Sequence, residues 1–125
     1  MSVKILLVED DNNIREMVSE YLEIVGYQVK SACEGHEALK YLSEETFDVL
    51  ITDINMPNGM GGIELINSVF ESKNTIPIIA MSGHNKNSEY VKGLRADVTF
   101  KEKPVQMSQL IETIKQVIQT KQGAA

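Results

Sequence analysis

The chain contains a single cysteine, Cys33, among its 125 residues, so no disulfide can form within it. A reducing compartment is the simplest interpretation of that cysteine usage. The sequence also lacks any apolar run near the roughly 20 residues that a membrane span needs. No charged n-region, long apolar segment or cleavage site is visible near Met1. We therefore expect a cytoplasmic domain that does not enter a membrane.

Positive charge is also scarce. Lys and Arg number 12 against 18 Asp and Glu, which gives a formal net charge of −6. No basic stripe offsets this negative field, so nucleic acid is not expected as a direct partner. A hydrophobic content of 42 % is ordinary for a globular protein, and the length is sufficient for one core. We expect one domain over residues 1–125, with its core from about 3 to 121.

Short apolar runs recur along the chain, and each ends at residues that can take part in chemistry. The runs and the residues after them are Ile5–Val8 before Glu9-Asp10-Asp11, Val49–Thr52 before Asp53, Ile78–Met81 before Ser82-Gly83, and a weaker segment around Val98 to Lys101 before Lys103-Pro104. Continuous apolar runs bounded by turn residues are typical of parallel strands buried on both faces. A further short strand is expected from Tyr27 to Ser31.

Helical periodicity alternates with these strands. Five helices are predicted, at Ile14–Val25 (with Asp11 or Asn12 as cap and Gly26 as stop), around Ala38–Leu42, at Ile63–Phe70, at Asn87–Arg95 and at Met107–Ile118. Five repeats of strand and helix with short connections predict a parallel sheet with helices on both faces, because crossovers are right-handed. The carboxyl ends of such strands form the ligand crevice. We therefore expect the acids, the serine and the lysine to converge there.

Glu9, Asp10 and Asp11 are three consecutive acids at the end of the first strand. Their mutual repulsion is costly unless a cation neutralises it, and carboxylates with backbone carbonyls suit Mg²⁺. The alternative is that Asp11 caps the following helix while the other two are solvated. For Glu9 and Asp10 taken alone, both interpretations stay open.

Asp53 ends a strand that should be central, because the residues before it are apolar on both faces. Taken alone, this acid fits a helix or turn cap. Beside Mg²⁺, however, a carboxylate can act as a nucleophile on phosphorus and carry an aspartyl phosphate. That chemistry needs a lysine and hydrogen-bond donors. Ser82 and Lys103 offer both at other strand ends, although each alone is a weak signal.

Taken together, these residues resemble a response-regulator receiver domain, the phosphoacceptor half of two-component signalling. The resemblance runs from about Val3 to Lys121 and rests on the motifs Ile5-Leu-Leu-Val-Glu-Asp-Asp11, Leu50-Ile-Thr-Asp-Ile-Asn-Met-Pro57, Ile78-Ile-Ala-Met-Ser-Gly83 and Lys103-Pro104. It implies a flavodoxin-like, doubly wound (βα)5 fold with sheet order 2-1-3-4-5, of which the family's chemotaxis member is a standard example. It also implies a signalling domain, not an enzyme, that catalyses only its own phosphorylation and dephosphorylation.

The resemblance further implies a role for each matching residue. Asp53 would be the phosphoacceptor, Asp10 the direct Mg²⁺ ligand, Glu9 a ligand through water, Asn55 a ligand through its backbone carbonyl, Ser82 a hydrogen-bond donor to the phosphoryl group and Lys103 its ion-pair partner. Lys101 is a competing lysine, and Lys103 is favoured because the family's lysine directly precedes proline. Asn55 and His84 would lie at the crevice rim and tune the lifetime of the phosphate.

Several residues depart from the family pattern. Phe100 occupies the position of an aromatic switch residue that is often tyrosine, so a switch here must work by packing. The loop Pro57–Gly62 is one residue longer than usual, with Gly61 where aspartate is common. His36 is expected at the surface, and Cys33 as a small packing residue.

The expected phosphodonor is a histidine kinase or a phosphotransfer protein. The expected output is a downstream protein, or a second copy of the chain, reading the face of the fourth helix, fifth strand and fifth helix. Three alternatives are a flavodoxin-type cofactor binder, an aspartate-nucleophile phosphohydrolase and a degenerate receiver that only dimerises. The acids after the first strand would repel a cofactor phosphate, Asp53-Ile-Asn55 follows the wrong strand for the hydrolase, and the intact acids, serine and lysine argue against degeneracy.

Overall fold

The computed structural model describes residues 3–56, 59–82, 98–103 and 105–123. Five parallel strands form one sheet in the order β2-β1-β3-β4-β5. They are β1 (Lys4–Val8), β2 (Gln28–Ala32), β3 (Val49–Asp53), β4 (Ile78–Ser82) and β5 (Thr99–Glu102). This order confirms the predicted flavodoxin-like fold, with the predicted strands shifted by no more than a residue or two.

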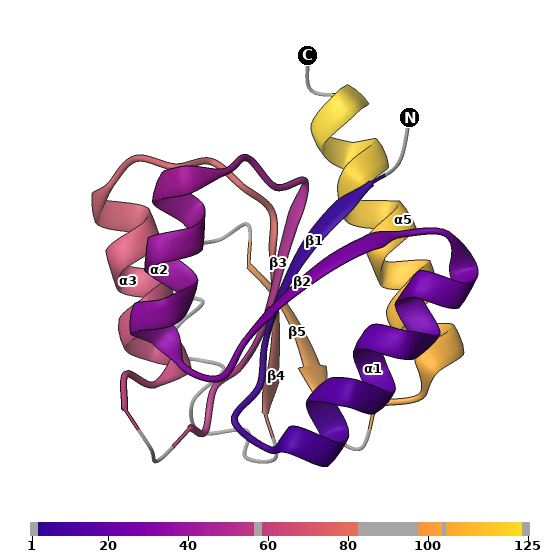
Figure 1. The fold of residues 1–125 in the computed structure, drawn as a ribbon. Helices are drawn as coiled ribbons and strands as arrows, with labels where there is room; N and C mark the ends of the chain where they lie inside the picture. The colour runs from indigo at the N-terminus through magenta and orange to yellow at the C-terminus, as the bar shows by residue number, and fades with distance from the viewer. Residues whose placement is uncertain (1–2, 57–58, 83–97, 104, 124–125) are drawn as a thin grey trace.

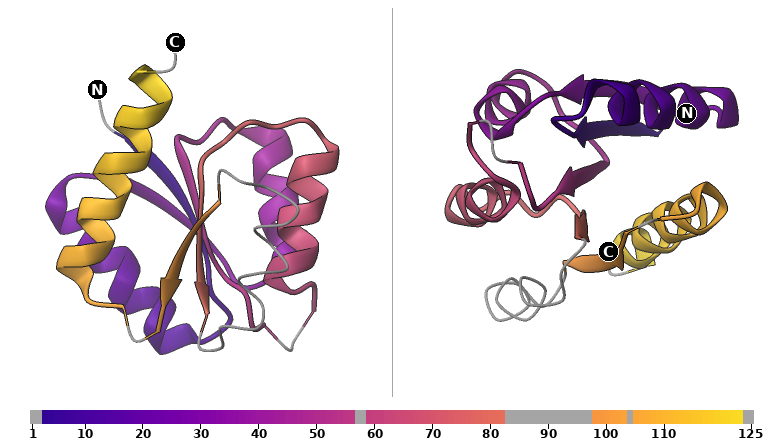
Figure 2. Two further views of the ribbon diagram at one scale, coloured as in Figure 1. Left: turned by 180° about the vertical axis from the view of Figure 1, so that it is seen from behind. Right: turned by 90° about the horizontal axis from the view of Figure 1, so that it is seen from below.

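Helices cover both faces of the sheet. They are α1 (Asn12–Val25), α2 (Gly35–Glu44), α3 (Gly62–Glu71) and α5 (Met107–Gly123). Figure 1 shows α1 and α5 on one side of the strands and α2 with α3 on the other, and Figure 2 shows the same layers from behind and from below. The predicted fourth helix, Asn87–Arg95, lies outside the described residues. None of the described helices combines the length and hydropathy of a membrane span.

Alternating residues of the inner strands feed two hydrophobic cores. In β1, Leu6 and Val8 belong to the core under α2 and α3, whereas Ile5 and Leu7 belong to the core under α1 and α5. Successive strand side chains point to opposite faces, so a strand covered on both sides must be apolar throughout. β3 is apolar at its first three positions and buried at all five, and its last two residues are Thr52 and Asp53. It lies between β1 and β4, the central place that its sequence predicts.

The first helix begins directly after the acidic triplet. Asp11 Oδ1 accepts a hydrogen bond from the N–H of Ile14 at 3.0 Å, which caps the helix as predicted. Gly26 ends it in the left-handed conformation, with φ of 116°. Because Asp11 is occupied as a cap, Glu9 and Asp10 are the members of the triplet that face the carboxyl end of the sheet.

Cys33 lies just past the end of β2 and is exposed. The prediction that it is a small packing residue is therefore wrong. Free cysteines are usually buried, but here the chain has already left the sheet and turns toward α2. The N–H of Cys33 donates to Glu37 Oε1 at 2.8 Å in that turn. His36 is exposed, as predicted.

Candidate functional site

Backbone hydrogen bonds continue past the strand ends and hold the loops that carry the candidate side chains. The N–H of Glu9 donates to Ala32 O at 3.1 Å, that of Ile54 to Met81 O at 2.9 Å and that of Lys103 to Ser82 O at 2.9 Å. Since all five strands are parallel, these loops all leave the sheet at the same side, the edge formed by the carboxyl ends of the strands. The sheet thus brings together side chains that are up to 94 positions apart, from Glu9 to Lys103.

One lysine faces three carboxylates at this edge. Lys103 Nζ lies 2.5 Å from Asp53 Oδ2 and 3.5 Å from Glu9 Oε1. Carboxylate oxygens of Glu9, Asp10 and Asp53 lie within 4.8 Å of one another. Asp53 is 3 % exposed and Glu9 2 % exposed, whereas Asp10 is partly accessible. With all four groups ionised, the cluster carries an excess of negative charge that Lys103 alone does not balance.

The remaining carboxylate oxygens are only partly satisfied. Asp53 Oδ1 accepts the N–H of Asn55 at 3.1 Å, and Glu9 Oε2 accepts the N–H of Asp11 at 3.1 Å. Glu9 Oε1 is buried and finds no hydrogen-bond partner within the described part of the chain. A buried oxygen of this kind is costly unless something else approaches it. It forms an ion pair with the Lys103 ammonium at 3.5 Å, too long for a good hydrogen bond.

The electrostatics of the cluster follow from this burial. Burial raises the pKa of Glu9, and the charge of Asp53 adds to that rise against the opposing effects of the Asp11 N–H and of Lys103. Burial alone would lower the pKa of Lys103, but the hydrogen bond and charge of Asp53, together with Glu9, outweigh it and leave this pKa raised. Lys103 therefore stays protonated, whereas ionisation of Glu9 is energetically unfavourable compared with that of an exposed glutamate.

The donor set fits a hard divalent cation. Carboxylate and backbone carbonyl oxygens are the ligands that Mg²⁺ takes in proteins, usually one or two carboxylates with several waters. Glu9, Asp10 and Asp53 supply such oxygens within 4.8 Å, and the unsatisfied Glu9 Oε1 lies 3.5 Å from the Lys103 ammonium that also contacts Asp53. A cation there would offset both the excess charge and the unpaired oxygen.

The other residues named from the sequence are placed as follows. Ser82 is buried at the last position of β4, and Asn55 is exposed directly after β3. Phe100 is half-buried in β5, against the core under α2 and α3. Lys101 is paired along the sheet with Met81, and the ammonium in contact with Asp53 is that of Lys103. His84 lies outside the described residues.

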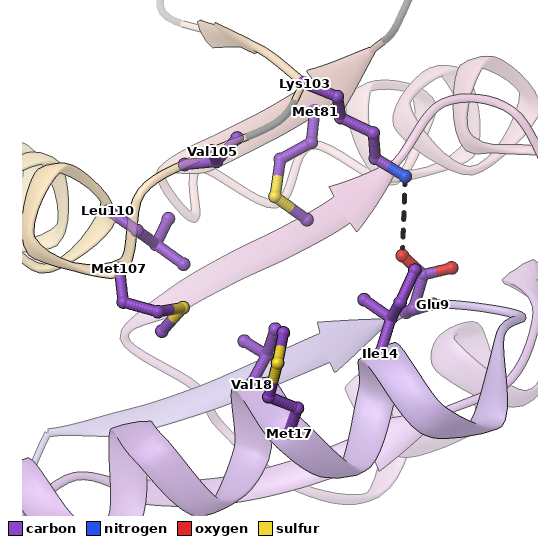
Figure 3. A pocket seen from close by; sticks show the side chains of 9 residues that line it. All are labelled: Glu9, Ile14, Met17, Val18, Met81, Lys103, Val105, Met107 and Leu110. Carbon is purple, nitrogen blue, oxygen red and sulfur yellow. Dashed lines mark ion pairs between the residues drawn. The ribbon is translucent and has the colours of Figure 1, made fainter.

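An apolar groove that sequence reasoning missed opens beside the ion pair. Its volume is about 360 Å³, and its wall includes Met17, Val18, Met107 and Leu110 from α1 and α5. Figure 3 shows Glu9 and Lys103 facing each other at one end of this groove. Met17 is 58 % exposed although it lies on the apolar stripe of α1. Helical spacing identified the apolar stripe, but it does not show which of its side chains remain uncovered by a neighbouring helix or strand.

Comparison with known proteins adds to this geometry. A family model described as the response regulator receiver domain matches residues 5–115. Response regulator MprA of Mycobacterium tuberculosis is 31 % identical over 119 residues, which are 94 % of this chain and 51 % of that protein. The chain thus spans about half the length of the curated relatives it matches.

Solved structures are similar over nearly the whole chain. A CheY-like response regulator receiver domain protein from Methanospirillum hungatei superposes with a TM-score of 0.89 at 28 % identity, covering 100 % of both chains. Response regulator protein TrrA from Thermotoga maritima, in complex with Mg²⁺-BeF, gives a TM-score of 0.77 at 30 % identity over 92 % of this chain and 98 % of that one.

Proposed function

The chain belongs to the response regulator receiver family, and on that premise we propose that it accepts a phosphoryl group on Asp53 in a two-component phosphorelay. The observation that carries the proposal is the setting of the Asp53 carboxylate. It is almost fully buried, it contacts the Lys103 ammonium at 2.5 Å, and it shares its surroundings with Glu9 and Asp10. A carboxylate that served only as a turn cap would not need this crowded setting.

The proposed step is a transfer between histidine and aspartate. An Asp53 carboxylate oxygen forms a bond to phosphorus while the P–N bond to the donor's imidazole breaks. The imidazole nitrogen keeps the bonding electron pair, and the product on this chain is an aspartyl phosphate. In the second reaction, water attacks the phosphorus, the P–O bond to the Asp53 carboxylate breaks, and inorganic phosphate leaves. We propose that the chain catalyses only these two reactions of its own.

The residues that would hold Mg²⁺ are Glu9, Asp10, Asp53 and Asn55. In the proposal Asp10 is a direct ligand, Glu9 acts through water and Asn55 uses its backbone carbonyl. When bound, the ion supplies positive charge to the oxygens of the transferring phosphoryl group. The unpaired Glu9 Oε1 supports this assignment, as does the Mg²⁺-BeF complex of the Thermotoga relative.

Two side chains from other strands would receive the phosphoryl group. Lys103 would move its ion pair from the Asp53 carboxylate to a phosphoryl oxygen, and Ser82 would donate a hydrogen bond to another. Asn55, at the exposed rim, and His84, outside the described residues, are proposed to control how water reaches the phosphorus. They would set the lifetime of the modification without changing its position.

The proposed partners are a histidine kinase or phosphotransfer protein as donor and a protein that reads the modified state. The reading face would comprise the segment Asn87–Arg95, which lies outside the described residues, together with β5 and α5. A downstream protein or a second copy of the chain would bind there. Response regulator MprA, one of the curated relatives, is about twice as long as the matched region.

Mass spectrometry tests the proposal directly. The chain is incubated with Mg²⁺ and acetyl phosphate, and intact mass should show one added phosphoryl group that is labile to base and hydroxylamine. Asp53→Asn should not gain it. Asp48→Asn is the matched control, because Asp48 is an exposed acid at the opposite end of the same strand, where it accepts the Lys4 N–H. An Asp53→Asn variant modified to the same extent as the parent would overturn the assignment.

The same experiment separates the alternatives. A degenerate receiver that only dimerises would gain no mass from acetyl phosphate or from any phosphohistidine donor. An aspartate-nucleophile phosphohydrolase would release phosphate from a small phosphoester through many turnovers. A single stable addition on Asp53 excludes both.

A further inference from the structure

We propose that Glu34 is a positioning residue that holds Met60 in place and so sets the backbone of Asn55 for chemistry at Asp53. This inference rests on the proposed function. Glu34 precedes α2 and caps it: Glu34 Oε1 accepts the N–H of His36 at 2.8 Å, and Oε2 accepts that of Glu37 at 3.2 Å. A cap needs no more than these two bonds.

Glu34 makes a third bond that leaves its own segment. Its Oε1 also accepts the N–H of Met60, 26 residues away, at 3.2 Å. The neighbouring Gly35 donates its N–H to Met60 O at 3.0 Å. Both backbone groups of Met60 are therefore bound by two consecutive residues, the N-cap and the first residue of α2. We call this arrangement the Met60 clamp.

Two glycines permit the close approach. A Cβ atom on Gly35 would lie 2.5 Å from Met60 Cγ, which leaves no room for one. Gly59 has φ of 100°, a conformation that side chains disfavour, and a Cβ there would lie 3.0 Å from Glu34 Oε1. Glycine at both positions is thus compatible with the clamp, whereas a larger residue at either position would disturb it.

The clamped loop is tied to Asp53 at both ends. At its start, the N–H of Asn55 donates to Asp53 Oδ1 at 3.1 Å. At its end, the N–H of Gly62 donates to Ile54 O at 3.1 Å, and a Cβ on Gly62 would lie 2.2 Å from Asp53 O. Met60 lies two residues before Gly62, and Ile54 directly precedes Asn55, so a displacement of Met60 is transmitted to Asn55 through this hydrogen bond. The backbone carbonyl of Asn55 is the proposed metal ligand.

The length of the Glu34 side chain matters in this arrangement. Aspartate is as good a helix cap as any residue, but it is one methylene shorter and would lose the reach to Met60. The N–H donors of His36, Met60 and Glu37 hold the pKa of Glu34 below its usual range, His36 contributing most. The carboxylate therefore stays ionised and available to all three donors at neutral pH.

Glu34→Asp tests the clamp while keeping the cap. Amide hydrogen exchange of Met60, measured by NMR without metal, should accelerate about tenfold when its hydrogen bond is lost. The dissociation constant for Mg²⁺, titrated as MgCl₂ and followed by amide shifts, should rise about tenfold, as is typical when a group that orients a metal ligand is removed. Glu34→Gln keeps the length and an acceptor oxygen, and should restore most of both.

Glu37→Gln is the matched control. Glu37 lies in the same first turn of α2, and its side chain accepts the N–H of Cys33 and, among the described residues, no hydrogen bond from Met60. It should leave Met60 exchange and Mg²⁺ affinity at the parent values. Faster Met60 exchange in Glu34→Asp with unchanged Mg²⁺ affinity would overturn the positioning role, and unchanged exchange would overturn the clamp itself. Neither measurement needs phosphorylation, so failure of Asp53 to accept a phosphoryl group would refute the proposed function separately.

Discussion

Lys103 Nζ and Asp53 Oδ2 lie 2.5 Å apart, although 50 residues separate them in the chain. The contact exists because β3 and β5 are parallel and flank β4, whose last residue accepts the backbone N–H of Lys103. In this structure the ammonium occupies the space around a carboxylate that we propose as phosphoacceptor. It therefore balances part of the charge that Mg²⁺ would balance.

Lys103→Met should separate these two effects. Removing the ammonium leaves three carboxylates without their cation, so Mg²⁺ should bind about threefold more tightly, because a competing positive charge is gone. Phosphorylation by acetyl phosphate should nevertheless slow by about tenfold or more, because the phosphoryl oxygens lose a charged hydrogen-bond donor. MgCl₂ titration and intact-mass time courses measure the two quantities. Lys101→Met on the same strand serves as control, and weaker Mg²⁺ binding in Lys103→Met would contradict the interpretation.

The raised pKa of Glu9 predicts how stability depends on pH without metal. A carboxyl whose pKa is raised by folding binds protons more readily in the folded state, so its ionisation opposes folding. That penalty is present at neutral pH and disappears as pH falls through the raised pKa toward the ordinary value of 4.5. Glu9→Gln carries no such penalty, and in EDTA at pH 7.5 it should melt a few degrees above the parent, at about 4 °C per kcal/mol.

The difference in Tm between Glu9→Gln and the parent is the measured quantity. It should shrink as pH is lowered toward 5, and it should reverse in sign in excess MgCl₂, where the parent gains a bound ion. Glu34 and Glu45 have lowered pKa values, so their ionisation stabilises the fold and this contribution is lost as pH falls. The loss is the same in the parent and in Glu9→Gln, so it does not affect the difference in Tm. A difference in Tm that is independent of pH and of Mg²⁺ would count against the buried, charged Glu9 described above.

Gly62 and Gly61 offer a matched test of the loop after Asp53. A Cβ on Gly62 would lie 2.2 Å from Asp53 O and 2.6 Å from Ile54 Cα, both backbone atoms that cannot step aside cheaply. Gly62→Ala should therefore lower the free energy of unfolding by about 2 kcal/mol, the usual cost of overpacking, and weaken Mg²⁺ binding. At Gly61 the nearest atom would be 3.7 Å away, so Gly61→Ala should stay within about 0.5 kcal/mol of the parent. Urea unfolding of the two variants decides the point, and equal stability would refute the close approach.

The sequence predicts the sheet well because its evidence is local. Each inner strand is a continuous apolar run, a pattern that only burial on both faces requires. The convergence of Glu9, Asp53, Ser82 and Lys103 then follows from parallel topology alone, before any contact is known. Sheet order did not come from the runs themselves but from the family resemblance, since periodicity does not say which strands are neighbours.

Contacts between loops are what the sequence could not predict. The bond from Met60 to Glu34 joins two segments that share no periodicity, so no sequence pattern pointed to it. The groove beside Met17 was missed for a related reason: helical spacing places Met17 on an apolar stripe but does not reveal that it is 58 % exposed. Cys33 was predicted wrongly because free cysteines are usually buried, whereas this one is exposed in a turn after the chain has left the sheet.

The relation between Ser82 and Phe100 leads to the last prediction. Ala80 is paired with Phe100, and Ser82 with Glu102, along adjacent strands. Residues two apart on a strand share a face, so Ser82 and Phe100 are diagonal neighbours on the side covered by α2 and α3. Phe100 is half-buried there, beside the small side chain of Ala80. A phosphoryl group on Asp53 that draws the Ser82 hydroxyl inward would free space into which the ring can turn.

Chemical-shift mapping with beryllofluoride and Mg²⁺ tests this switch. The parent should show changes at Asn55 and Ser82 and also at the Phe100 ring, together with neighbouring amides of β5. In Ser82→Ala the changes at Asn55 should persist while those at Phe100 fall by at least half, because the ion still binds but the hydroxyl no longer moves. Phe100→Leu, which keeps an apolar side chain of smaller size, should retain the Ser82 changes. If the Phe100 ring is silent in the parent, the ring is a fixed part of the core and the fifth strand carries no signal.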